Sequence, residues 1–118
     1  MLQVYVPSRS RFDRSLTLEA LDGEWPRDHV FLVVPSDQAK DYRKLAKKHD
    51  VTLLSCPDNG IALTRRFCGN HAKDKFLMMD DDLRFSMRES GEDWHLYPFG
   101  PGDMEGMLGY IERILSKY

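Results

Sequence analysis

Four short segments of the chain are mostly hydrophobic or β-branched, and each ends at a proline or at polar residues. Runs of about five such residues are typical of strands that are buried on both faces of a parallel sheet. Pro7 and Pro35 directly follow the first two segments, and proline does not continue a central strand. The pattern therefore predicts four buried strands, at about residues 2–6, 30–34, 51–55 and 75–79.

Between these segments, apolar residues recur every three to four positions, which is the spacing of an amphipathic helix. Asp13 is a suitable N-cap for the first helix, and Ser36 or Asp37 for the second. We expect helices at about residues 14–21, 37–49, 61–73 and 104–118. Strands that alternate with helices favour right-handed crossover units, and hence an α/β fold with a mostly parallel sheet and helices on both faces.

The pattern changes after the fourth strand. Residues 86–103 are rich in glycine, proline and charge, and they include Trp94, Tyr97 and Phe99. We expect an ordered or semi-ordered loop here, because linkers seldom contain so many aromatic residues. The 118 residues suffice for one domain. Its predicted parts are a core at residues 2–88, the aromatic loop at 86–103 and a C-terminal helix at 104–118.

Charge and cysteine content narrow the possible environments of the chain. The net charge of −2 gives the whole surface no strong attraction to nucleic acid or membrane, although it leaves room for a local basic patch. Five basic residues between positions 40 and 48 are typical of a solvated helix face.

Cys56 and Cys68 lack metal-ligand and disulfide spacings, so we expect reduced thiols. Without an apolar run of transmembrane length or a signal peptide, we expect no membrane partner.

The most distinctive polar motif is Asp80-Asp81-Asp82, hereafter the acidic triplet, directly after the fourth predicted strand. Open α/β sheets bind ligands beyond the carboxyl ends of their strands. Three adjacent carboxylates repel one another and favour a nearby cation, and a divalent metal that carries substrate phosphates is a common solution. The alternative is an acidic turn that caps the following segment. Neither GxGxxG nor GxxxxGK[ST] follows the first strand, which disfavours a dehydrogenase and a P-loop NTPase.

Three segments together resemble the core of a GT-A glycosyltransferase, and they occur in the order expected for that fold. They are residues 4–11, 59–66 and 76–83, within a similarity that covers about residues 2–88. The group that they resemble is the phage-type, TET-associated glycosyltransferases, which is linked to the addition of sugars to hydroxymethylated pyrimidines in DNA. The resemblance implies a Rossmann-like, three-layer fold with strand order 3-2-1-4. It also implies a nucleotide-diphosphate sugar donor (a UDP-sugar first), a manganese or magnesium cofactor, a DNA acceptor and a phage- or bacteria-encoded enzyme in the host cytoplasm.

The resemblance also implies roles for individual residues around the donor. Pro7, Ser8 and Arg9 would line the nucleoside pocket, and Asp37 would accept a hydrogen bond from the base or ribose. Gly60 would let the backbone come close to the ligand. Arg65 would pair with the diphosphate, for which a guanidinium fork is well shaped.

The acidic triplet would be a DxD motif in this comparison. Asp80 and Asp82 would be its outer members, with Asp82 as the main metal ligand and Asp80 holding the ribose or a metal-bound water. Asp81 would belong to the nucleotide-sugar site. The metal would neutralise the leaving diphosphate.

The part of the chain after the acidic triplet departs from the pattern, because only about 36 residues follow it. Residues 91–94 resemble the acidic motif that carries the catalytic base of inverting members, which makes Asp93 a candidate base; the alternative is a solvated loop. Trp94, Arg84 and Arg88 are candidate acceptor contacts, and the alternative for the aromatic residues is that they seal the sheet. The chain would be a compact enzyme, a truncated one or a subunit completed by a partner.

Three function classes remain open from the sequence. The first is a metal-dependent glycosyltransferase. The second is a nucleotidyltransferase, although the loop after the first strand lacks the glycine that such enzymes normally have there. The third is a non-catalytic module that binds a nucleotide sugar or DNA and lacks the acceptor half. The reaction product distinguishes the three classes. A glycosyltransferase releases a nucleoside diphosphate, a nucleotidyltransferase releases pyrophosphate, and a binding module shows no turnover.

Overall fold

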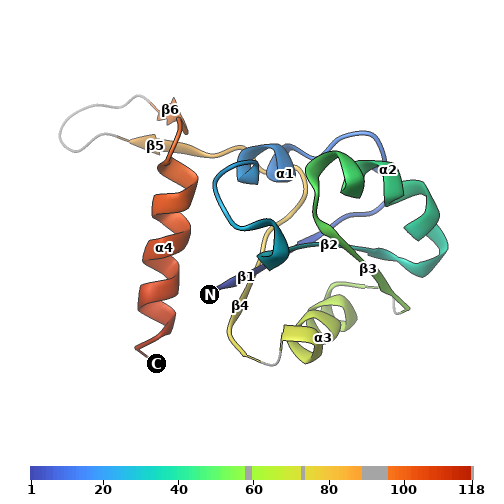
Figure 1. Ribbon diagram of the computed structural model, residues 1–118. Coiled ribbons are helices and arrows are strands. Elements are labelled where there is room, and N and C mark those ends of the chain that lie inside the picture. Colours follow the sequence, from blue (N-terminus) through green and yellow to red (C-terminus); the bar gives the residue numbers. More distant parts are fainter. Residues whose placement is uncertain (58–59, 73, 89–95, 118) are drawn as a thin grey trace.

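A four-stranded parallel sheet in the order β3-β2-β1-β4 organises the computed structural model, which describes residues 1–57, 60–72, 74–88 and 96–117 (Figure 1). The strands are β1 (Gln3–Pro7), β2 (Val30–Pro35), β3 (Thr52–Cys56) and β4 (Phe76–Met78). The helices are α1 (Leu16–Leu21), α2 (Ala39–His49), α3 (Ile61–Ala72) and α4 (Asp103–Leu115), with short 3-10 turns η1 (Arg27–His29) and η2 (Ser36–Gln38). The strand order and the α/β class predicted from the sequence are confirmed.

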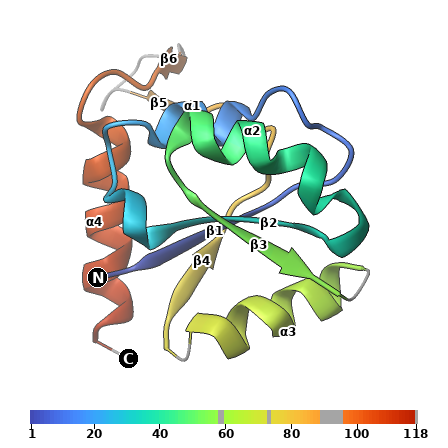
Figure 2. The same ribbon diagram turned by 45° about the vertical axis from the view of Figure 1, so that its right-hand side comes forward.

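Side-chain alternation along the strands divides the hydrophobic core into two layers. Val4 and Val6 of β1 belong to the larger cluster, together with buried residues of α1, α2 and α4. Tyr5 lies between them in sequence and points to the opposite face, where it packs with Phe31 and Cys68. Because successive residues of a strand face opposite sides, one hydrophobic run supplies both layers. Figure 2 shows α1 and α2 on one face of the sheet, α3 on the other, and α4 at the side.

The start of α1 differs from the sequence-based expectation. The helix begins at Leu16, and its N-cap is Ser15, whose hydroxyl accepts a hydrogen bond from Leu18 N at 3.2 Å. Asp13, the expected cap, lies outside the helix. Serine and aspartate are comparable N-caps, so local sequence could not choose between them. Ser15 is selected because it is buried and its hydroxyl also donates to a backbone oxygen of the acidic triplet.

The predicted aromatic loop at residues 86–103 contains regular structure. Ser86–Arg88 (β5) pairs antiparallel with Leu96–Pro98 (β6), and the residues between these strands lie outside the described part of the chain. Phe99 N donates to Phe85 O at 3.0 Å, and the two rings stack with centroids 5.7 Å apart against the larger core cluster. Strands of three residues are too short to show a hydrophobic alternation, which explains why the hairpin was predicted as a loop.

Within the described ranges, none of the helices is long and apolar enough to cross a membrane.

Candidate functional site

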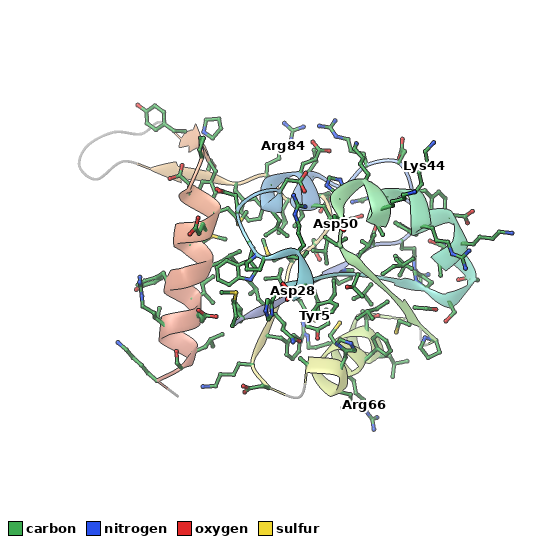
Figure 3. All side chains as sticks on the ribbon, in the orientation of Figure 1. Tyr5, Asp28, Lys44, Asp50, Arg66 and Arg84 are labelled. Atoms are coloured by element: carbon green, nitrogen blue, oxygen red, sulfur yellow. The ribbon has the colours of Figure 1, made fainter. Side chains whose placement is uncertain are left out.

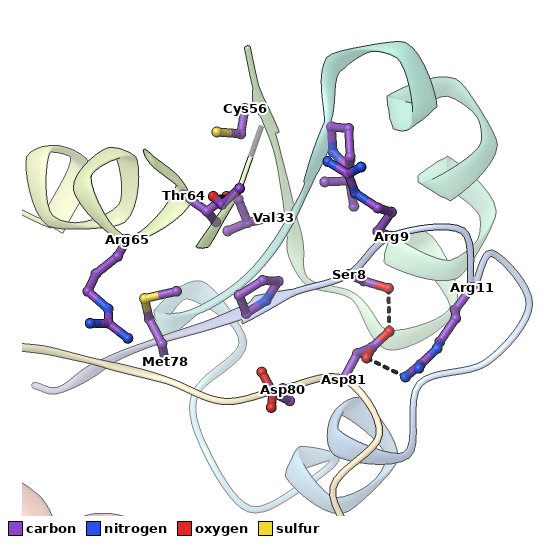
Figure 4. A pocket seen from close by; sticks show the side chains of 14 residues that line it. Ser8, Arg9, Arg11, Val33, Cys56, Thr64, Arg65, Met78, Asp80 and Asp81 are labelled. Carbon is purple, nitrogen blue, oxygen red and sulfur yellow. Dashed lines mark hydrogen bonds and ion pairs between the residues drawn. The ribbon is translucent and has the colours of Figure 1, made fainter. Parts of the chain in front are cut away.

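A pocket of about 500 Å³ lies at the carboxyl ends of the central strands (Figure 4). Parallel strands end together at this edge, which is where open α/β sheets bind ligands. Most of the residues that the resemblance assigned to the nucleotide sugar line it: Pro7, Ser8, Arg9, Gly60, Arg65, Asp80 and Asp81. Sequence reasoning missed the other lining residues: Arg11, Val33, Val34, Pro35, Cys56, Thr64 and Met78.

Asp81 is the buried member of the acidic triplet, with 8% of its surface exposed. Its carboxylate accepts a hydrogen bond from Ser8 Oγ at 2.5 Å and one from Arg11 Nη1 at 2.9 Å. Because the single Ser8 proton goes to Asp81, the Tyr42 hydroxyl, 2.8 Å from Ser8 Oγ, donates to Ser8. Tyr42 accepts in turn from the Arg11 backbone N at 2.9 Å. This network joins the loops after β1 and β4 to α2.

The backbone of the acidic triplet is also held in place, by the start of α1. Ser15 Oγ and Thr17 N both donate to the Asp81 carbonyl, at 3.1 and 3.2 Å. The Thr17 hydroxyl donates to the Asp80 carbonyl and accepts from Leu83 N at 3.1 Å. Backbone groups that would otherwise lack partners at the end of β4 are thereby satisfied, and the backbone from which the Asp80 side chain extends is held in place.

The two outer members of the triplet differ in their surroundings. Asp80 is exposed and lines the pocket, and its carboxylate has no hydrogen-bond or ion-pair partner among the described residues. Asp82 does not line the pocket and is ion-paired with Arg11 Nη1 at 3.1 Å. The hydrogen bond with Asp82, and then the charges of Asp81 and Asp82, raise the pKa of the Arg11 guanidinium above its ordinary value. Arg11 therefore supplies a cation to two of the three adjacent carboxylates, Asp81 and Asp82.

The residues present suit a metal that is shared with a substrate rather than enclosed by the protein. No group of three metal-binding side chains exists among the residues that the structure describes. Magnesium is commonly held by one or two carboxylates together with substrate phosphates. Asp80, unpaired and facing the pocket, fits that role directly. Asp82, expected to be the main ligand, is held by Arg11 at the edge of the site.

The opposite wall of the pocket is formed by the start of α3. Gly60 has φ +98°, a conformation that favours glycine, and its carbonyl accepts from both Thr64 N and Thr64 Oγ1, at 3.0 and 2.8 Å. Arg65 extends from this helix, while Asp80 enters from the other wall (Figure 4). The amino end of a helix and a guanidinium both favour an anion. The pocket thus has one wall whose groups favour an anion and one wall that carries a carboxylate.

The remaining predicted residues lie elsewhere. Asp37 is in η2, exposed and not among the lining residues of the pocket. Arg84 lines a second hollow of about 750 Å³ between α1 and α4, which also contains Phe85 and Phe99. Asp93 and Trp94 are outside the described residues, as is the Arg88 side chain. Arg11 was within a quoted motif, but its pairing with the triplet is a long-range contact that spacing does not reveal.

Comparison with known proteins gives one result that covers most of the chain. A family model described as TET-Associated Glycosyltransferase matches residues 2–98. The searches of curated proteins and of solved structures found no match. The matched region contains the sheet, both walls of the pocket and the hairpin strands. The chain therefore belongs to the TET-associated glycosyltransferase family.

Proposed function

We propose that this chain is a metal-dependent glycosyltransferase that binds a nucleoside-diphosphate sugar, a UDP-sugar first, in the pocket at the carboxyl ends of the strands. The observation that carries the proposal is the opposition of Asp80 to the start of α3 and Arg65 across this pocket. A volume of about 500 Å³ is in the range of small-ligand sites. The family match supports sugar transfer as the reaction.

The two walls divide the work of donor binding. Arg65 and the amino end of α3 bind the diphosphate, since both present positive charge and N–H donors to it. Pro7, Ser8 and Arg9 hold the nucleoside beside the apolar surface that Val33 contributes. A hydrogen bond from the base or ribose to Asp37 stays part of the proposal, although Asp37 is exposed in η2 and does not line the pocket.

Asp80 and the phosphates of a donor on the opposite wall are the groups that would hold a metal. Asp80 would hold it together with diphosphate oxygens, and Asp82 would join only after releasing Arg11. When bound, a divalent cation neutralises the charge that develops on the leaving diphosphate. Manganese and magnesium both accept such oxygen ligands.

For the acceptor, we propose hydroxymethylated pyrimidine in DNA, in the cytoplasm of a host cell. This proposal keeps Asp93 as the catalytic base. It also keeps the candidate acceptor contacts Trp94, Arg84 and Arg88. A base in a duplex must leave the stack before an enzyme can modify it, and an aromatic side chain offers it a replacement stacking surface. Trp94→Ala should then lower transfer to DNA while donor hydrolysis without acceptor persists. Loss of both activities with a lower melting temperature would assign Trp94 to the core.

Ligand-dependent thermal stability tests donor binding directly. UDP with manganese should raise the melting temperature, because a ligand that binds only the folded state stabilises it with the logarithm of its excess over Kd. UDP without metal should have a smaller effect. No shift with any nucleoside diphosphate would contradict the proposal. Incubation with UDP-glucose and hydroxymethylated DNA should release UDP. Release of pyrophosphate from a nucleoside triphosphate would indicate a nucleotidyltransferase. Binding of the nucleotide without turnover would indicate a non-catalytic module.

A further inference from the structure

The outer face of α2 carries an unusual concentration of positive charge. Five of its eleven residues are lysine or arginine, all of them exposed: Lys40, Arg43, Lys44, Lys47 and Lys48. Asp41 is the only acid in the helix. Because the chain as a whole has a net charge of −2, this is a local excess and not a property of the entire surface. The sequence alone is compatible with an ordinary solvated face, but the structure adds two observations.

The first observation is that most of these cations have no partner. Among the described residues, Lys40, Arg43, Lys44 and Lys47 form no ion pair or side-chain hydrogen bond. Arg14 and Arg27, by contrast, each pair with a carboxylate at 2.8 to 2.9 Å. Like charges four residues apart, such as Lys40 and Lys44, destabilise a helix slightly. The row is therefore unfavourable for the free protein, which points to an external anion.

The second observation is that the row begins beside the loop that forms part of the pocket. Gln38, just before α2, accepts a hydrogen bond from Ser10 N at 2.7 Å, and Tyr42 accepts one from Arg11 N at 2.9 Å. These contacts fix the start of α2 against the loop that carries Arg9 and Arg11 into the pocket. From Lys40 to Lys48 the row spans about 12 Å at 1.5 Å per residue. Figure 3 shows Lys44 on the outer side of α2, and Arg66 on the opposite side of the sheet.

We propose that the outer face of α2 is a contact surface for the phosphate backbone of a nucleic acid and guides DNA toward the pocket. Cations in a row suit a polymer with regularly spaced charges, and such phosphate contacts set position without reading sequence. An anionic membrane is a poorer fit. The larger apolar residues of α2, Tyr42 and Leu45, are buried, which leaves none to insert into a lipid interface. The identity of the nucleic acid as acceptor rests on the proposed function.

The test compares two triple variants of equal charge change. The first variant removes three cations of the row and keeps good helix formers; it combines Lys40→Gln, Lys44→Gln and Lys47→Gln. The control combines Arg66→Gln, Arg113→Gln and Lys117→Gln, three exposed cations on α3 and at the end of α4. Binding of a fluorescent 20-base-pair duplex containing hydroxymethylcytosine is measured by anisotropy between 50 and 200 mM salt. A loss of about 0.9 in the slope of log K against log salt is expected per lost phosphate contact.

For the α2 variant, this predicts a slope reduced by between about 2 and 3 and affinity at least tenfold weaker at 50 mM salt. The control variant should keep the slope of the wild type. Equal slopes in all three proteins, or binding by the wild type to phosphatidylserine vesicles but not to the duplex, would overturn the inference. The effect of UDP on the melting temperature separates the two proposals. If UDP with manganese did not raise the melting temperature of the wild type, donor binding would be contradicted and the DNA result would stand.

Discussion

The two walls of the pocket are built in different ways. The wall after β1 and β4 is held by long-range contacts, because buried Asp81 accepts hydrogen bonds from Ser8 and Arg11, and Ser15 and Thr17 fix its backbone. The wall at the start of α3 is exposed, and its hydrogen bonds at Gly60 come from Thr64 of the same helix. Segments with few long-range contacts open and adjust most readily. We infer that the first wall is the more rigid and positions Asp80, and that the wall at the start of α3 is the more adaptable and, under the proposed function, contacts the donor.

The largest expected effect comes from removing the central contact of the rigid wall. Asp81→Ala should lower the free energy of unfolding by between about 2 and 3 kcal/mol, because hydrogen bonds to a buried charged group are lost. Urea denaturation measures this change. The matched control is Asp80→Ala, which removes an exposed and unpaired carboxylate and should stay within about 0.5 kcal/mol of the wild type. Equal losses in both variants would show that the two neighbouring carboxylates are not structurally different.

The two outer members of the triplet, Asp80 and Asp82, should differ in ligand binding. Asp80→Asn should remove most of the manganese-dependent gain in UDP affinity, since the side chain that faces the pocket loses its charge. Isothermal titration with and without manganese measures this gain. Asp82→Asn should have a smaller effect because Asp82 is held by Arg11 outside the pocket lining. A larger loss in the Asp82 variant would identify Asp82 as the main metal ligand.

On the adaptable wall, Arg65→Lys should weaken UDP binding by about fivefold and leave stability unchanged. Lysine keeps the charge, but it lacks the planar fork that binds two phosphate oxygens at once. The dissociation constant of UDP is the quantity to measure, with Arg66→Lys as a control on the neighbouring, exposed position. Identical constants for the Arg65 variant and the wild type would place Arg65 outside the donor site.

The smallest effect tests the packing beneath α3. The Tyr5 hydroxyl is hydrogen-bonded to His71 of α3 at 2.7 Å, and burial, then the charge of Cys68, raises its pKa from 10.0 to about 12. The folded chain holds this proton more tightly than the unfolded chain. The resulting stability is therefore fully present below pH 10 and is lost as the pH rises toward 12. Tyr5→Phe should cost about 1 kcal/mol at neutral pH.

Urea denaturation of this variant between pH 9 and 12 should show a weaker decline of stability than the wild type. An identical decline in the two proteins would show that Tyr5 keeps an ordinary pKa and that the α3 layer is more open than the structure indicates.

The sequence by itself determined the sheet and half of the pocket lining. Runs such as residues 30–34, which are short, rich in valine and followed by a proline, favour strands buried on both faces, and the loops that follow parallel strands meet at one edge. This argument places the acidic triplet at that edge, whereas the roles of Ser8 and Arg9 follow from the family resemblance. The strand order and the role of Gly60 came from the motifs that the chain shares with a family, not from periodicity.

Only the tertiary structure separated the three carboxylates of the triplet. Asp80, Asp81 and Asp82 are identical in type and adjacent in sequence, but a side chain is buried or exposed according to what packs against it. Arg11 lies about seventy residues earlier in the chain, and its ion pairs with Asp81 and Asp82 exist only after the sheet has formed. The same holds for Ser15, chosen over Asp13 as a cap because it reaches the Asp81 carbonyl. Long-range partners such as these decide which carboxylate holds the fold and which one is left for a ligand.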